Sequence, residues 1–155
     1  MSKIHAFDFE FDHDYTLIGI HSILEDYRMA YFLNQNLKVH LNRFKEDLDF
    51  PSKHCSFSFY NYEDKATFTS WSLIANKHTF TNNVKGVNNN LFKEETKTSF
   101  LIPEKKNVDY FIKICGNIGA DKLQNILSKI NNTDKIITSY AINPYDLKSK
   151  DYLIF

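Results

Sequence analysis

The sequence predicts a single α+β domain in which a largely antiparallel sheet of about seven strands packs with two helices. Short apolar runs alternate as β-strands do, and most are joined by turns too short for parallel crossovers. Two longer segments have the spacing of amphipathic helices. The chain of 155 residues is 43% hydrophobic and contains 14 Phe and 9 Tyr, which is enough apolar material for one core. No linker or repeat divides it, so we expect one domain over residues 1–155.

The N-terminal part predicts two strands followed by a helix. Residues 7–12 alternate Phe with acidic side chains, and residues 15–20 form a second apolar run. Ser22 and Glu25 have the spacing of a capping box, so a helix is expected to begin at Ser22. Its buried stripe is expected to contain Ile23, Tyr27, Ala30 and Tyr31, widened by Met29, Phe32 and Leu33.

The middle of the chain predicts three more strands and a loop. Residues 37–44 alternate and predict a strand that returns from the helix. Residues 55–62 and 67–74 predict a hairpin, because the polar corner at residues 61–65 separates them. Residues 82–90 contain five Asn and have no periodicity, which predicts an exposed, mobile loop.

The last third predicts strands on both sides of a proline and then a helix and a strand. Residues 100–102 and 108–115 are apolar, and Pro103 between them restricts the backbone so that the first strand ends there. Residues 121–130 have an apolar helical stripe, and residues 136–142 predict a final clear strand.

Charge and targeting signals exclude several classes of protein. The 19 basic and 19 acidic side chains balance, which argues against a strongly basic nucleic-acid binder. Residues 1–75 carry seven basic and eleven acidic side chains, whereas residues 76–155 carry twelve and eight. The halves can neutralise one another within the domain, attract a second copy, or present a modest basic face to RNA. No signal-peptide pattern or membrane span occurs, so we expect a cytoplasmic protein with no membrane partner.

The residue clusters that suggest a metal site or a catalytic pair are better explained as ordinary strand residues. Asp8, Glu10, Asp12 and Asp14 are oxygen donors, but same-face strand residues lie about 6.6–6.8 Å apart and cannot converge on one cation. His54 and Cys55 are adjacent, so on a strand they point to opposite faces and cannot activate each other. No phosphate-binding or hydrolase motif occurs. We therefore expect no catalytic residue, metal or cofactor.

A glycine-containing segment and an aromatic strand keep alternatives open. Residues 116–119 lie between a strand and a helix, where amides can hold a phosphate, although an ordinary turn is favoured because Asp121 follows. Tyr60 and Tyr62 are expected to point outward from their strand, with Trp71 on the next strand. Such a face is either the partly exposed edge of the core, a protein interface or a base-stacking platform.

One short motif resembles a known family. Ile102-Pro103-Glu104 and, after four further residues, Asp109-Tyr110 resemble the signature of the IPExxDY family, a bacterial family of small proteins of about this length. The segment from Leu24 to Arg28 extends the resemblance. The family has no known function, so the resemblance implies no site residues. The motif is either a local structural turn or a docking loop.

Together these observations favour a non-catalytic cytoplasmic module that binds another protein, and we do not expect an enzyme. The alternative is an RNA- or ribosome-associated protein that uses the aromatic sheet face, and a third hypothesis is a small enzyme or ligand-binding protein with a site under residues 82–90. A homo-oligomer is compatible with each. The predicted interaction residues are Pro103, Glu104, Asp109, Tyr110, Tyr60, Tyr62 and Trp71.

Overall fold

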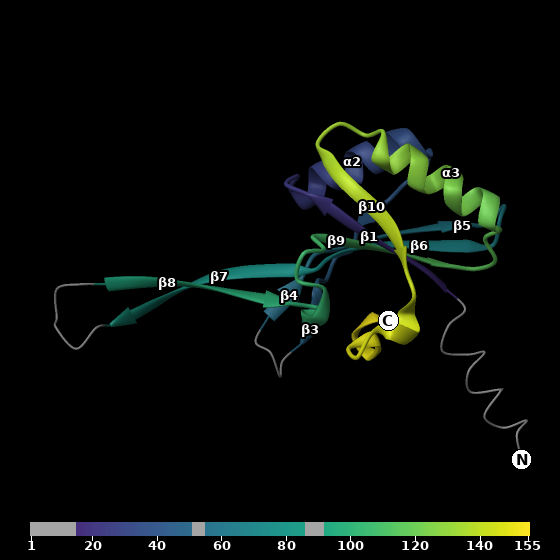
Figure 1. Cartoon of the computed structure of the whole chain (residues 1–155). Helices are drawn as coiled ribbons and strands as arrows, with labels where there is room; N and C mark the ends of the chain where they lie inside the picture. The colour runs from purple at the N-terminus through teal and green to yellow at the C-terminus, as the bar shows by residue number, and fades with distance from the viewer. Residues whose placement is uncertain (1–14, 51–54, 86–91) are drawn as a thin grey trace, which may run out of the picture.

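The α+β class is confirmed. The computed structural model describes residues 15–50, 55–85 and 92–155, and its centre is a six-stranded antiparallel sheet in the order β10-β1-β9-β6-β5-β2 (Figure 1). Two helices lie on one face of this sheet, and a C-terminal segment lies on the other. The predicted strand at residues 7–12, its acidic side chains and His54 lie outside the described residues.

The elements have the following bounds. The strands of the main sheet are β1 (Tyr15–Ser22), β2 (Asn42–Arg43), β5 (Phe59–Asp64), β6 (Thr69–Ala75), β9 (Tyr110–Cys115) and β10 (Ile136–Ile142). Two small sheets consist of β3 (Leu48–Phe50) with β4 (Cys55–Phe57), and of β7 (Lys77–Lys85) with β8 (Phe92–Phe100). The helices are α2 (Asp26–Leu37) and α3 (Ala120–Asn131), and short 3-10 turns are η2 (Pro103–Lys105), η3 (Pro144–Asp146) and η4 (Lys150–Leu153).

The sheet is buried on both faces, so two apolar clusters share its strands. The helix-side core lies under α2 and α3 and includes Ile18, Leu73 and Ile112. The tail-side core lies under residues 101–108 and the C-terminal tail, which we define as residues 143–155. Phe57 and Phe111 are its largest fully buried side chains. Because successive strand residues alternate between the faces, both sets of positions in the central strands are occupied by buried residues.

β1 is an interior strand of the sheet, because it pairs with β9 on one side and with the edge strand β10 on the other. Gly19 faces the tail side, where an added Cβ would lie 2.7 Å from the Ile142 side chain, so glycine permits this close packing. The outer edge of β10 is partly capped, because Asn131 of α3 accepts hydrogen bonds from the Ser139 amide and hydroxyl. Such side-chain capping protects an exposed sheet edge from pairing with another strand.

The predicted start of the first helix is wrong, and its predicted buried face is right only in part, since Met29, Ala30 and Leu33 are buried and Phe32 is partly buried. Ser22 belongs to β1, where its amide and hydroxyl bond to Asp109 and Lys135, and α2 begins four residues later, after Glu25. The buried side of α2 consists of Met29, Ala30 and Leu33. The other members of the predicted stripe, Ile23, Tyr27 and Tyr31, are exposed.

Two strand predictions and one loop prediction also need correction. Residues 37–44 contain only the two-residue β2, although Val39 and Leu41 are buried as the alternation predicts. Residues 55–62 divide at Ser58 into β4 and β5, which join different sheets. Residues 82–85 belong to β7 rather than to a loop, and β7 and β8 form a nine-pair ribbon that projects away from the main sheet (Figure 1).

The predictions for the C-terminal half are closer. α3 covers the predicted residues 121–130 with one extra residue at each end, and it buries Ile126 and Ile130. β10 has the predicted bounds, and β9 begins two residues after the predicted start. The predicted strand at residues 100–102 is wrong, because β8 ends at Phe100; Leu101 and Ile102 are buried outside any strand, and η2 begins at Pro103.

Candidate functional site

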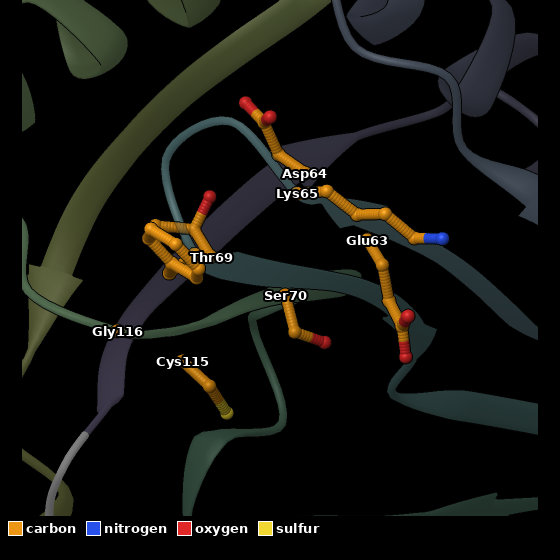
Figure 2. Close-up of a pocket in the computed structure, with 8 residues that line it drawn as sticks. Glu63, Asp64, Lys65, Thr69, Ser70, Cys115 and Gly116 are labelled. Carbon is orange, nitrogen blue, oxygen red and sulfur yellow. The ribbon is translucent and has the colours of Figure 1, made fainter.

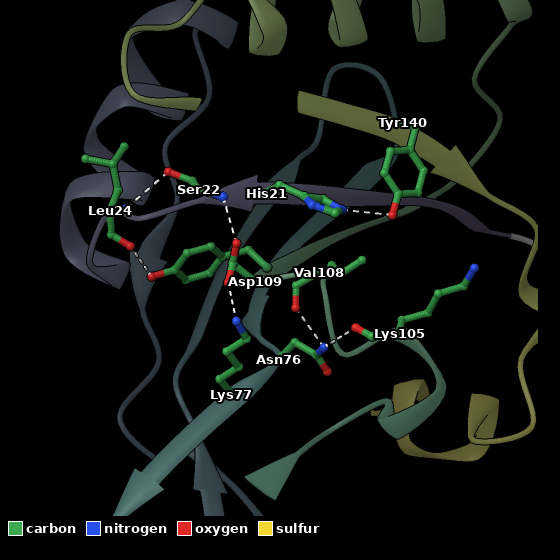
Figure 3. A network of polar contacts seen from close by, with 10 residues as sticks. His21, Ser22, Leu24, Asn76, Lys77, Lys105, Val108, Asp109 and Tyr140 are labelled. Atoms are coloured by element: carbon green, nitrogen blue, oxygen red, sulfur yellow. Dashed lines mark hydrogen bonds and ion pairs between the residues drawn. The ribbon is translucent and has the colours of Figure 1, made fainter. Parts of the chain in front are cut away.

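Asp109 and Tyr110 of the predicted docking motif are engaged inside the fold (Figure 3). The Asp109 carboxylate accepts a hydrogen bond from the Ser22 amide at 2.8 Å and forms an ion pair with Lys77 Nζ at 2.7 Å. The Tyr110 hydroxyl donates to the Leu24 carbonyl at 2.6 Å. Burial, followed by the charge of Asp26, raises the pKa of Tyr110. Tyr110 therefore connects β9 to the segment between β1 and α2, and Asp109, just before β9, connects to the last residue of β1 and the first of β7.

A buried asparagine that sequence reasoning missed organises the same region. Asn76 is fully buried and donates to the carbonyls of Lys105 at 2.9 Å and Val108 at 2.8 Å. Its side-chain oxygen accepts from the Ile102 amide at 2.8 Å. The segment from Ile102 to Val108 has no regular ladder of its own, so Asn76 supplies the hydrogen bonds that its backbone needs. The motif is thus fixed from both of its ends.

Pro103 and Glu104 lie at the surface of the same segment. The Glu104 carboxylate accepts from the Ser149 amide at 2.7 Å and from the Ser149 hydroxyl at 2.9 Å. Partial burial acts to raise the pKa of Glu104, but these hydrogen bonds, with others from the backbone, outweigh it and hold the pKa below the usual 4.5. The motif residues therefore do not form one shared patch, because Glu104 points to the C-terminal tail and Tyr110 points under α2.

Acidification is expected to release the contact between Glu104 and Ser149. Since the folded-state pKa of Glu104 is depressed, its stabilising effect is fully present above about pH 4.5 and is lost as the pH falls through the folded value. In an NMR titration the Ser149 amide shift should follow this protonation. Glu104→Gln should remove the dependence, and an equal response in that variant would contradict the assignment.

The aromatic residues predicted to face outward do not form an exposed platform. Tyr60 and Trp71 are 8% and 5% exposed and belong to the helix-side core, and Tyr62 is partly buried against the same core. The prediction failed because it assumed that one face of β5 is open to solvent, whereas α2 and α3 cover the face that carries the tyrosines. Phe59 lies on the opposite, tail-side face, as its alternation with Tyr60 requires.

Large exposed side chains lie on the outer face of α2 and in the segment just before it. Tyr27 and Tyr31 are one turn apart on α2 and are 59% and 57% exposed, and Ile23, which precedes the helix, is 83% exposed. We call these three residues the α2 ridge. The Tyr31 hydroxyl accepts from Gln35 at 2.8 Å, so the polar group of this ring is satisfied along the helix. The spacing was visible in the sequence, but it was assigned to the core side.

The start of α2 is fixed against the sheet. Arg43 of β2 forms ion pairs with Asp26 at the first turn of α2 and with Asp47. The guanidinium carbon of Arg43 also lies 5.4 Å from the centre of the Tyr60 ring. Although exposed ion pairs contribute little stability, a planar guanidinium held by two carboxylates and a ring fixes an orientation well. The α2 ridge is therefore presented by a helix whose position is defined.

A shallow pocket of about 440 Å³ lies at the end of the sheet where β5 turns into β6 (Figure 2). Cys115, Ser70 and Glu63 are direct neighbours across β9, β6 and β5, and their side chains point to the tail side. Gly116 closes one wall and has a φ of 114°. No hydrogen bond joins these three side chains within the described part of the chain, so they are not a preformed nucleophile and base.

Lys113 lies one step further along the same face of β9. It is 7% exposed, and its ammonium donates to the Leu153 carbonyl at 2.6 Å. The rings of Tyr15 and Phe155 lie 4.8 and 4.5 Å from Nζ. Burial lowers the pKa of Lys113, and the nearby Cys115 thiol opposes this effect. This buried cation was not singled out by the sequence patterns, because a lysine in an apolar strand gives no sign of what covers it.

The described residues also bear on metal binding and on membrane insertion. Across residues 15–50, 55–85 and 92–155, no three His, Cys, Asp or Glu side chains gather as metal ligands would. Within the same ranges, no helix has the length and apolar character needed to span a bilayer. Comparisons of the chain with protein-family models, with curated proteins and with solved structures found no match.

Proposed function

We propose that this protein is a non-catalytic module that binds another protein through the α2 ridge. The observation that carries the proposal is the exposure of Tyr27 and Tyr31, one turn apart on a helix whose other side is buried, together with the exposed Ile23 just before that helix. Large apolar side chains in a contiguous exposed row are typical of interaction surfaces, and tyrosine is enriched among residues that dominate binding energy. Cytoplasmic location and membership of the IPExxDY family remain predictions.

The geometry of the ridge favours a helix as the binding element of the partner. Side chains spaced four residues apart form a straight ridge, and such ridges pack into the grooves of a second helix. Glu25 and Arg28 are exposed beside the ridge and carry opposite charges. We therefore expect an amphipathic helix with an apolar stripe, a basic residue near Glu25 and an acidic residue near Arg28.

A photo-crosslinking experiment tests this proposal. A photoreactive phenylalanine analogue at position 27 should crosslink to one discrete protein in cells of the native host, and the crosslinked peptide should have the pattern of an amphipathic helix. The product should persist after nuclease treatment, which distinguishes it from an RNA-dependent contact. The same analogue at Ile137, which is 72% exposed on β10, serves as the matched control.

Substitution at the ridge should remove the product without unfolding the protein. In a variant with the analogue at Ile23, Tyr27→Ser together with Tyr31→Ser should abolish crosslinking, while the free energy of unfolding should change by less than about 1 kcal/mol because both rings are exposed. A product of equal yield from positions 27 and 137 would contradict the proposal. The RNA-associated alternative stays a prediction, and Tyr60 and Trp71 of the sheet face predicted for it are buried.

A further inference from the structure

The ammonium of Lys113 is buried with fewer partners than it can bind. A lysine ammonium has three N–H donors, and the Leu153 carbonyl accepts one of them at 2.6 Å. No carboxylate forms an ion pair with Lys113 among the described residues, although a buried cation normally needs an anion. A neutral carbonyl and two aromatic rings compensate only part of the lost hydration.

A second buried polar residue is the cross-strand neighbour of Lys113. This residue is Ser72 of β6, and it is 8% exposed. In the described ranges its hydroxyl has no hydrogen-bond partner, although buried hydroxyls are normally bonded. Neighbouring side chains of this kind have Cβ atoms about 4.5–5.5 Å apart, so one small ligand can reach both. Asn61 continues the row on β5.

The end of the C-terminal tail covers the row formed by Lys113, Ser72 and Asn61. Leu153 is fully buried and anchors the C-terminal tail, but Ile154 and Phe155 beyond it are 69% and 45% exposed. The Phe155 ring contacts Lys113 and also lies 5.0 Å from the ring of Phe59. The tail thus places two groups against Lys113: the Leu153 carbonyl, which accepts a hydrogen bond from the ammonium, and the Phe155 ring.

We propose that Lys113 and Ser72 form a binding site for a small aromatic carboxylate, and that the Leu153 carbonyl and the Phe155 ring occupy this site as an internal ligand. A carboxylate offers the same oxygen with a full negative charge, so its hydrogen bonds to the ammonium are stronger than those of a carbonyl. Its second oxygen can accept from the Ser72 hydroxyl. Its ring takes the place of the Phe155 ring beside Phe59.

The internal ligand predicts competition between the tail and the added carboxylate. A ligand that binds only when Phe155 leaves must offset the contacts of that ring, so removal of the ring should tighten binding. A ligand that binds elsewhere on the surface would not respond in this way. The direction of this change therefore separates the proposed site from adventitious binding.

Isothermal titration calorimetry with 3-phenylpropanoate on the full chain tests the proposal. Phe155→Ala should bind the probe at least about tenfold more tightly than the wild type, which corresponds to about 1.4 kcal/mol. Adding Lys113→Met should abolish binding, and adding Ser72→Ala should weaken it. Lys106→Met, which removes an exposed lysine at the other end of the tail-side surface, is the matched control and should leave the affinity unchanged.

A second measurement keeps the test decisive if Lys113→Met does not fold. On Phe155→Ala alone, the neutral analogue 3-phenylpropanamide should bind at least about tenfold more weakly than the carboxylate, because it cannot neutralise the ammonium. Equal affinity for both probes, or no gain of affinity in Phe155→Ala, would overturn the proposal. Circular dichroism and thermal unfolding establish that each variant used is folded.

Discussion

Replacing Asn76 by alanine is expected to lower the free energy of unfolding by about 3–5 kcal/mol. The change removes the side-chain partner of the Val108 carbonyl and of the Ile102 amide, and one of two partners of the Lys105 carbonyl, which also accepts from the Val108 amide. Each buried group left without a partner costs about 1–3 kcal/mol, and water that enters the space restores part of this. Asn76 is fully buried, so the loss is among the largest that one polar residue in this chain can cause.

Urea unfolding followed by tryptophan fluorescence measures this loss, because Trp71 is buried. The matched control is Asn125→Ala, which removes an exposed amide from α3 and places a better helix former there. The control should be neutral or slightly stabilising. A loss of less than about 1 kcal/mol in Asn76→Ala would show that the segment from Ile102 to Val108 holds its conformation without this side chain.

Replacing Gly116 by alanine is expected to cost about 2–4 kcal/mol. The φ of 114° at Gly116 is a conformation that residues with a Cβ rarely adopt, which accounts for about 1–3 kcal/mol. An added Cβ would also lie 2.9 Å from the Phe68 carbonyl oxygen and 3.0 Å from a Thr69 methyl. Since the first of these is a backbone atom, a change of side-chain rotamer cannot relieve the contact.

Gly119, three residues later in the same connection, provides the control. An added Cβ there would meet nothing within 4 Å, and its φ of −66° suits any residue. Gly119→Ala should therefore change the free energy of unfolding by less than about 1 kcal/mol, since the loss of a favourable cap is offset by a less flexible unfolded chain. Similar denaturant midpoints for the two variants would contradict the strain assigned to Gly116.

The periodic segments were predictable because local pattern and burial agree in them. In α3 only one stripe is apolar, so its bounds and its buried Ile126 and Ile130 follow from spacing alone. α2 has two candidate stripes, and helical periodicity cannot say which of them meets the sheet. The stripe with Met29 and Leu33 is the buried one, and it has no hydroxyl groups that need partners.

The side-chain hydrogen bonds could not be predicted from the sequence, because the bonded residues are far apart along the chain. The Asp109 carboxylate accepts a hydrogen bond from the Ser22 amide, 87 positions away. Glu104 likewise meets Ser149, 45 positions away. Such contacts depend on strand order, which no single-sequence pattern specifies. For the same reason the sequence does not predict that Leu153 and Phe155 cover Lys113.

The position of β1 has a consequence for the order in which a nascent chain can fold. This strand is made early, yet its two neighbours, β9 and β10, are about 90 and 120 residues later in synthesis. Until they leave the ribosome, both edges of the apolar β1 remain unpaired. Chains whose strands pair across long sequence separations fold slowly, and their intermediates expose apolar surface and unpaired strand edges. Truncations that end before β10 are therefore expected to be aggregation-prone rather than partly folded.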